Sequence, residues 1–357
     1  MAGDPTTRPT MGWSAPPRRA HIVEPLSPGV HAFDFQPAGC MAVLIAALSL
    51  AVTQVPADTM TFGRIEVAPA ESVAFGSIGS GPPVIIVPGM LGSAFSFRAI
   101  IGPVAAKGYR VIVIDPLGTG LSNSPEKADY SLSAQAVRIG AAVRAIDIDR
   151  AVFLCHSVSS AICLRLAYES PDLVAGIVSI NGGAAERQAT PGLRFALKLA
   201  SVIRFIAGDG WARGKVKDGL RNSSADPAWV TDEIVKAYTG YFGGMGNALS
   251  TLKRMANSEE PEPLAPLLPG IVSPVLLLLG GGTKDGLPPA DEMVRLATLP
   301  RFEVDTVAAA GQYVQEEQPD AVISSVVEMA RGVLRQPRVA VPELGLTPIR
   351  IRRPVRN

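Results

Sequence analysis

The chain is poor in histidine and cysteine, two side chains that often carry nucleophilic or acid–base chemistry. Only six positions hold them: His21, His31, His156, Cys40, Cys155 and Cys163. Three cysteines are too few for the disulfide framework of a small secreted domain, and their spacing has no paired metal-ligand pattern. We therefore expect no metal and no cofactor, and the cysteines leave the redox compartment open.

The sequence also lacks an excess of charge of either sign. Its 33 basic and 32 acidic residues give a formal net charge of +1. A protein that binds phosphate backbones usually carries a clustered basic excess, so nucleic acid is excluded as an expected partner. The chain has 357 residues, 47% of them hydrophobic, which is enough for one large α/β domain with extensions.

Charge is absent altogether between Asp34 and Asp58, where residues 37–53 are almost wholly apolar. Such a run is at the lower limit of the length that spans a bilayer. We expect residues 37–57 to be an uncleaved transmembrane or signal-anchor segment that contacts a membrane. The end of this segment also resembles a small-residue cleavage site, although cleavage there would remove far more than an ordinary signal peptide. A buried helix of a soluble protein is the other alternative.

Residues 1–36 are rich in Pro, Ala, Thr and Arg and show no helical or strand period, which predicts an extended arm. Three arginines precede the apolar segment, whereas only Arg64 follows it closely. The positive-inside rule then places the N-terminus in the cytoplasm. The main domain is expected on the other side of the membrane, which is the periplasmic side in a bacterium.

Short apolar runs alternate with helical segments across residues 60–336. The expected strands are 84–87, 111–114, 151–154, 176–180, 275–279 and 302–307, and the clearest helices are 133–146 and 159–170. Continuous apolar strands that alternate with helices indicate a doubly wound, mostly parallel α/β sheet. Residues 184–268 interrupt the alternation with amphipathic helices, which predicts a cap over the carboxyl edge of the sheet.

Two loops after predicted strands carry recognisable motifs. Residues 79–90 read GSGPPVIIVPGM, and residues 115–122 read DPLGTGLS. Together with the order of the elements, they resemble the α/β-hydrolase superfamily. The resemblance implies that the first loop supplies an oxyanion-hole N–H from Met90, although Pro88-Gly89 stands where the family commonly has His-Gly. The second loop is interpreted as a glycine-rich structural turn rather than a chemical site.

The family's nucleophile elbow, Gly-x-Ser-x-Gly, corresponds here to Cys155-His156-Ser157-Val158-Ser159. Both glycines are replaced, but by small residues. The resemblance places Ser157 as the nucleophile and Val158 N–H as the second oxyanion donor. A serine on an ordinary strand-to-helix turn is the alternative.

The acid and the base of the triad are expected after the last two strands. The loop Gly280–Pro289 is similar to the family's acid loop and makes Asp285 the candidate acid, although Lys284 stands at the usual position and Asp291 is a rival. The segment 311–319 matches the family's Gly-His-x-x-x-x-Glu-x-Pro, but Gln312 replaces the histidine. An amide does not accept a proton near neutral pH.

No other histidine replaces the base convincingly. His21 and His31 precede the expected membrane segment, and His156 should point away from its neighbour Ser157 because successive residues of a strand face opposite sides. Losing one triad member leaves a rate enhancement of roughly 10³–10⁴ over water. The site is therefore expected to be vestigial.

Residues 337–357 form a proline-punctuated tail with five arginines and one acid, Glu343. Such a tail suits anionic lipid or an acidic protein surface, or it is a solubilising extension. The leading hypothesis is a membrane-tethered α/β-hydrolase-fold protein that has lost triad catalysis. It would be a binding or structural subunit that meets protein partners through its arm and tail and holds a small apolar ligand under the cap. The alternative is an exported, esterase-like serine hydrolase with a non-standard base.

Overall fold

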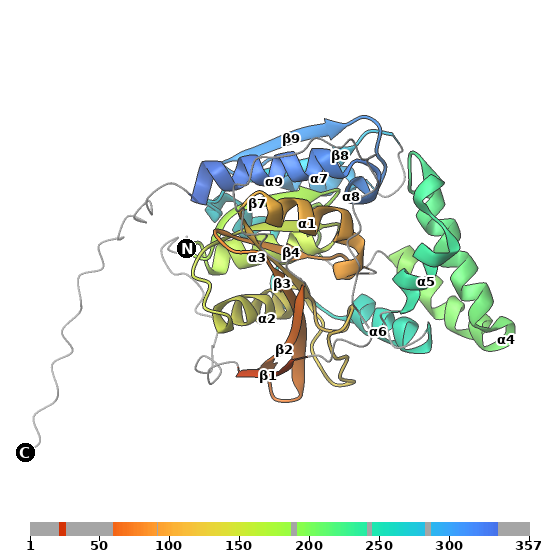
Figure 1. Ribbon diagram of the computed structural model, residues 1–357. Coiled ribbons are helices and arrows are strands. Elements are labelled where there is room, and N and C mark those ends of the chain that lie inside the picture. Colours follow the sequence, from red (N-terminus) through yellow and green to blue (C-terminus); the bar gives the residue numbers. More distant parts are fainter. Residues whose placement is uncertain are drawn as a thin grey trace, which may run out of the picture.

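The computed structural model describes residues 21–25, 60–90, 92–186, 191–240, 245–282 and 287–334. These residues form an α/β domain whose sheet is covered by helices on both faces (Figure 1). The predicted membrane segment 37–57 and the tail 337–357 lie outside the described residues. Within the described part, every helix is too short or too polar to cross a bilayer.

A nine-stranded sheet forms the centre of the domain, in the order β1-β2-β3-β5-β4-β6-β7-β8-β9. The strands are β1 (His21–Pro25), β2 (Thr61–Ala68), β3 (Glu71–Ile78), β4 (Pro83–Val87), β5 (Arg110–Asp115), β6 (Ala151–His156), β7 (Val174–Ile180), β8 (Val275–Gly280) and β9 (Phe302–Val307). Strands β4 to β9 pair in parallel, whereas β1, β2 and β3 pair antiparallel with their neighbours. The predicted, mostly parallel sheet is thus confirmed. The antiparallel strands β1, β2 and β3 were not predicted individually.

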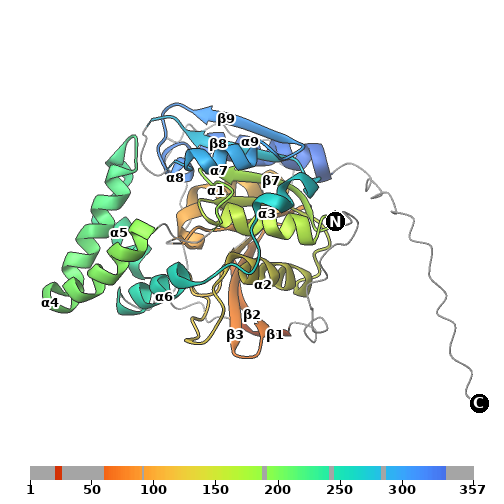
Figure 2. The ribbon, with the colours of Figure 1, turned by 180° about the vertical axis from the view of Figure 1, so that it is seen from behind.

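Side chains of the buried strands point alternately to the two faces of the sheet. Both faces are apolar, which explains why helices cover both of them. In β4, Ile85 and Val87 pack into one core while Val84 and Ile86 pack into the other, because successive side chains of a strand point to opposite faces. Helices α2 (Leu132–Ala145) and α3 (Ser159–Glu169) cover the first face, and α1 (Arg98–Ala106) and α9 (Pro319–Leu334) cover the second (Figure 2). The remaining helical segments of the sheet region are η1 (Ala94–Phe97), η3 (Ala265–Gly270), α7 (Ala290–Leu296) and α8 (Val314–Glu317).

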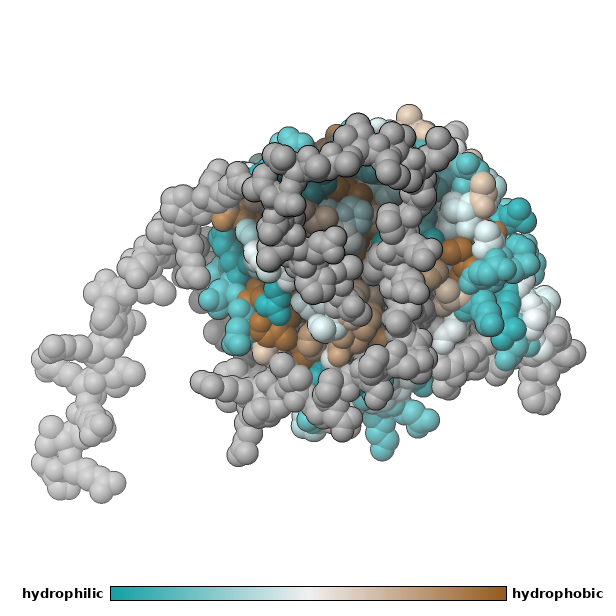
Figure 3. Space-filling model, in the orientation of Figure 1, coloured by the Kyte–Doolittle hydropathy of each residue, from teal (hydrophilic) through white to brown (hydrophobic). Residues whose placement is uncertain are grey.

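The segment 184–268, expected to be a cap, contains the helices between β7 and β8. It contains α4 (Pro191–Asn222), η2 (Pro227–Trp229), α5 (Asp232–Gly240) and α6 (Met245–Asn257). Figure 1 shows α4 and α5 extending beyond one edge of the sheet, and the described surface there is mostly hydrophilic (Figure 3). Gly208 interrupts α4 with φ 78° and ψ 178°, so the helix consists of two straight halves.

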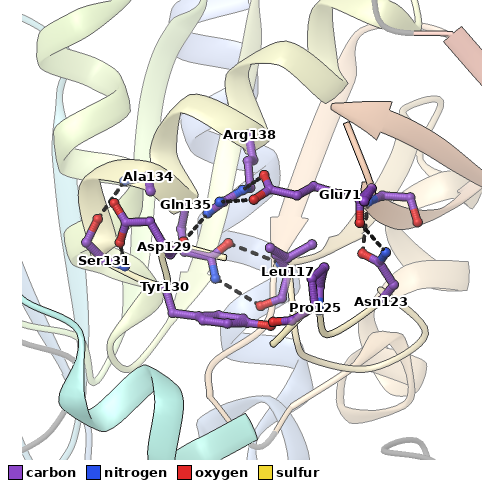
Figure 4. Close-up of polar contacts among 12 residues, drawn as sticks. Glu71, Leu117, Asn123, Pro125, Asp129, Tyr130, Ser131, Ala134, Gln135 and Arg138 are labelled. Atoms are coloured by element: carbon purple, nitrogen blue, oxygen red, sulfur yellow. Dashed lines mark hydrogen bonds and ion pairs between the residues drawn. The ribbon is translucent and has the colours of Figure 1, made fainter. Parts of the chain in front are cut away.

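An ion pair and hydrogen bonds join β3 and the turn at 115–122 to α2 (Figure 4). The Arg138 guanidinium binds the carboxylate of Glu71 in β3 with two bonds of 2.8 and 2.9 Å. The Gln135 amide accepts from the Leu117 N–H at 3.1 Å and donates to the Leu117 carbonyl at 2.9 Å. The glycine-rich turn at 115–122 is therefore held by side chains of the helix that follows it.

Strand β1 bears on the predicted membrane topology. It pairs antiparallel with β2, with His21 opposite Glu66 and Ile22 opposite Ile65. The strand before the predicted segment 37–57 and the strand after it therefore belong to one sheet. A single membrane crossing by that segment would put β1 and β2 on opposite sides of the bilayer, so this pairing is incompatible with the predicted orientation.

Candidate active site

Ser157 lies where the predicted nucleophile elbow should be, between the end of β6 and the start of α3. Its φ is 54°, a left-handed conformation that costs a non-glycine residue about 1–2 kcal/mol. The Ser157 N–H donates to the Ile180 carbonyl at 2.9 Å. Within the described part of the chain, the Ser157 hydroxyl makes no hydrogen bond. The strained turn is therefore present, but nothing described there accepts the hydroxyl proton.

Each replaced glycine of the elbow has acquired a bond of its own. Cys155 forms a disulfide with Cys163 of α3, eight residues later, and both sulfurs lie in the core. The Ser159 hydroxyl donates to the Pro88 carbonyl at 2.5 Å. The sequence analysis did not pair these cysteines. Their positions on a strand and on the helix that packs over it were the available signal.

The loop at residues 88–90 lies directly against the elbow. A Cβ added at Gly89 would be 3.0 Å from the His156 carbonyl oxygen and 3.4 Å from Ser157 Cβ, so a glycine permits this close approach. Among the described residues, the backbone N–H groups of Met90 and Val158 donate to no acceptor. These two N–H groups remain available to a carbonyl or anionic oxygen, as the oxyanion-hole prediction requires.

Gln312 occupies the loop between β9 and α8 and is 8% exposed. Its N–H donates to the Ser223 carbonyl at 2.7 Å, while its side-chain oxygen Oε1 is buried and has no partner in the described structure. A buried polar atom without a partner costs about 1–3 kcal/mol. The amide therefore presents an unused acceptor beside the elbow loop.

His156 contacts this same loop instead of the serine hydroxyl. Its Nε2 lies 3.1 Å from the Gln312 carbonyl oxygen. Because a carbonyl only accepts, the ring proton is on Nε2 and Nδ1 carries the lone pair. Burial lowers the pKa of His156 to about 4, against the opposing effect of that hydrogen bond. The imidazole is therefore neutral at physiological pH.

The loop that carries Gln312 is tied to the cap by Glu317. One carboxylate oxygen accepts from the Gly311 N–H at 2.9 Å, and the other accepts from the N–H groups of Ala225 and Asp226 at 2.7 and 2.9 Å. Asn181, at φ 44°, links the same loop to the sheet by donating to the Gly311 carbonyl and accepting from the Gly280 N–H. Glu317 is the glutamate of the family motif, but its contacts could not be predicted from the sequence, and no motif pointed to Asn181.

The carboxylates near the site have separate roles. Asp285 lies outside the described residues, so its place relative to Ser157 stays a prediction. Asp291 is exposed at the start of α7 and pairs with Arg295 at 2.9 Å, as a surface carboxylate would. Burial raises the pKa of Asp115 to about 7, although the Leu121 N–H donates to it.

Asp115 and the turn that follows it fit a structural role. Gly118 and Gly120 have φ values of 85° and 52°, and the Ser122 hydroxyl donates to the Asp115 carbonyl at 2.5 Å. A Cβ at Gly120 would overlap the Asp115 carboxylate. The glycines are therefore required by the turn, in agreement with its interpretation as a structural element.

Aromatic side chains from three separate segments meet where the cap covers the site. The rings of Tyr313 and His156 are 5.7 Å apart, and those of Tyr313 and Trp229 are 5.4 Å apart. Tyr238 of α5 packs against Phe95 at 5.9 Å. These contacts form a partly buried apolar wall beside Gln312. In the described residues, no group of three or more His, Cys, Asp or Glu is placed to hold a metal ion.

Comparison with known proteins agrees with this geometry. Residues 82–226 match the family model described as alpha/beta hydrolase fold. The chain is 26% identical to the magnesium-chelatase 30 kDa subunit of Rhodobacter capsulatus over 251 residues, which cover 67% of this chain and 84% of that protein. It is 24% identical to the uncharacterized hydrolase YugF of Bacillus subtilis over 247 residues, 67% of this chain and 86% of that protein.

Solved structures agree as well. An alpha/beta hydrolase fold protein from Burkholderia ambifaria superposes with a TM-score of 0.63 at 24% identity, covering 74% of this chain and 96% of that one. This likeness concerns the fold. Together, the sheet order, the left-handed elbow serine and the family model that matches residues 82–226 support membership of the α/β-hydrolase superfamily.

Proposed function

We propose that this chain is an α/β-hydrolase-fold protein that has lost triad hydrolysis and binds a carbonyl-containing, apolar ligand as a non-catalytic subunit. The observation that carries the proposal is Gln312, a buried amide with an unused acceptor in the loop where the family places its base. The neutral His156 is engaged by the Gln312 carbonyl. Its Nδ1, which carries the lone pair, makes no hydrogen bond to the Ser157 hydroxyl among the described residues.

The available polar groups favour binding of a particular kind of molecule. The N–H groups of Met90 and Val158 are free to donate to a carbonyl oxygen, and Gln312 Oε1 is free to accept from a ligand N–H or O–H. The aromatic wall of Tyr313 and Trp229 offers apolar contact. A ligand with a carbonyl, a nearby donor and an apolar body would use all of these groups.

Likeness to a protein named as a subunit supports the non-catalytic role. The magnesium-chelatase 30 kDa subunit matches this chain over 84% of its own length. We extend to this chain the idea of a subunit that works within a larger assembly, through the arm 1–36 and the basic tail 337–357. The disulfide between Cys155 and Cys163 supports a location outside the reducing cytoplasm. Contact with a membrane through residues 37–57 belongs to the same proposal.

One specific observation favours a second candidate, a serine hydrolase with a non-standard base. The elbow keeps its strained φ of 54° at Ser157, and both predicted oxyanion donors are free. Strain of this kind is usually retained at functional sites. The relative named hydrolase YugF fits this reading.

A fluorophosphonate probe and a p-nitrophenyl ester separate the two candidates. We expect the native chain to show no Ser157-dependent labelling or turnover, because the hydroxyl lacks a base. Gln312→His restores an imidazole at the family's position and should raise labelling of Ser157, by roughly 10²–10⁴-fold if the acid is in place. Ser157→Ala in each background is the control. Brisk native turnover that Ser157→Ala abolishes would establish the hydrolase instead.

A further inference from the structure

Two large apolar side chains are exposed on the first half of α4, although the described surface of the cap is mostly hydrophilic. Phe195 is 70% exposed and Leu199 is 49% exposed. These residues are four apart and therefore lie on one side of the helix, one turn from each other. They are two of the few large hydrophobic side chains that the described part of the chain exposes.

The opposite side of the same half-helix faces the site. Leu197 is buried against Leu252 and Ala256 of α6, and Met90 packs on the same cluster. The helix thus separates the predicted oxyanion loop from an exposed apolar surface. Whatever covers Phe195 and Leu199 is therefore separated from Met90 by this half-helix.

The charge of the first half of α4 indicates which kind of surface it would bind. Between Glu186 and Asp209 there is no acidic residue, while Arg187, Arg194, Lys198 and Arg204 are basic. An apolar, basic helix that lacks the length and hydropathy to cross a bilayer fits the interface of an anionic membrane. The break at Gly208 separates this half from the second half, which carries acidic residues as well as basic ones.

We propose that residues 191–207 of α4 dock on the surface of an anionic lipid bilayer, with Phe195 and Leu199 in the headgroup boundary. This contact is additional to any made by residues 37–57 and does not depend on whether Ser157 is catalytic. Through Leu197 and Met90, the docked helix would bring the site next to the acyl chains. An apolar ligand could then pass between bilayer and site without crossing water.

Quenching of an introduced tryptophan by brominated lipid tests this contact in the full-length chain. Phe195→Trp is compared with Val294→Trp, since Val294 of α7 is 71% exposed but lies outside the cap. Fluorescence of the parent chain, which contains other tryptophans, is subtracted. In vesicles of equal parts brominated phosphatidylcholine and phosphatidylglycerol, we expect several-fold stronger quenching for Phe195→Trp.

Two changes should weaken that quenching. Vesicles of brominated phosphatidylcholine alone remove the anionic charge, and Lys198→Glu in the Phe195→Trp background reverses one basic charge. Each basic residue near an anionic surface strengthens binding by about fivefold, which corresponds to about 1 kcal/mol. Equal quenching of Phe195→Trp and Val294→Trp would overturn the proposal. So would an absence of quenching in Phe195→Trp while the chain remains bound to the vesicles. The second result would mean that another segment alone holds the membrane.

Discussion

At the scale of single residues, Gln312 combines burial with an unsatisfied acceptor. Folding strips water from Oε1 without supplying a donor in the described structure. Proteins keep such costs mainly where function requires them. A donor from a bound ligand, as proposed above, would pair this oxygen.

Gln312→Leu should therefore stabilise the unliganded protein. Removing a buried, unpaired amide and keeping the side-chain volume should raise the free energy of unfolding by about 1 kcal/mol. Chemical denaturation at neutral pH measures the change. The matched control is Gln135→Leu, which removes an amide that bonds to both backbone groups of Leu117 and should lower the free energy of unfolding. A loss of stability in Gln312→Leu as large as in the control would show that the Gln312 amide is structurally paired.

At the scale of elements, the unit formed by β6 and α3 is fastened at three places. The disulfide joins Cys155 to Cys163, the Ser159 hydroxyl binds the Pro88 carbonyl, and the Ser157 N–H binds the Ile180 carbonyl. These bonds connect the elbow to its own helix, to the loop that holds Met90, and to β7. The elbow is held in its strained form by its surroundings rather than by glycine.

Replacing both cysteines, Cys155→Ala with Cys163→Ala, should lower the free energy of unfolding by about 2–3 kcal/mol. This is the loop-closure contribution expected for a short disulfide loop. Denaturation with and without reductant measures it: reductant should weaken the parent chain and leave the double variant unchanged. Alkylation of the unfolded, unreduced parent at all three cysteines would show that the bond is absent.

At the scale of the whole molecule, the sheet begins before the apolar segment and resumes after it. Strand β1 pairs with β2, so residues 21–25 of the arm belong to the same sheet as the domain. A topology with the arm in one compartment and the domain in another would break that pairing. Membrane contact on one side is the arrangement that preserves the sheet.

A cross-strand disulfide checks this arrangement. Ile22 and Ile65 are direct partners in the register, so Ile22→Cys with Ile65→Cys should form a disulfide in the membrane-bound, full-length chain. Peptide mapping under non-reducing conditions detects it. Ile22→Cys with Ser77→Cys, in the neighbouring strand β3, is the control that should stay unlinked. No linkage in the first pair, with both thiols reactive from opposite sides of the membrane, would restore the single-crossing topology.

Most of the fold was predictable because the strands that carry it are continuous apolar runs ending in glycine, aspartate or serine. Ser157 was found because it follows such a strand, and Gln312 because the segment 311–319 matches the family motif. The features that were not predicted are contacts that form only when the chain is folded. The contacts of Glu317 with Ala225 and the pairing of β1 with β2 join residues that are far apart in the sequence, and the disulfide was missed although its two cysteines are eight residues apart. Asp285 stays a prediction.

The bond between Cys155 and Cys163 also limits how this sequence can change over evolutionary time. Replacing Cys155 by the glycine that is usual in the family would leave an unpaired thiol in α3, and a change at Cys163 would leave one on β6. Neither site can drift alone at low cost, so the two codons should be inherited or replaced together. A glycine elbow would therefore require substitutions at both cysteine positions rather than at one.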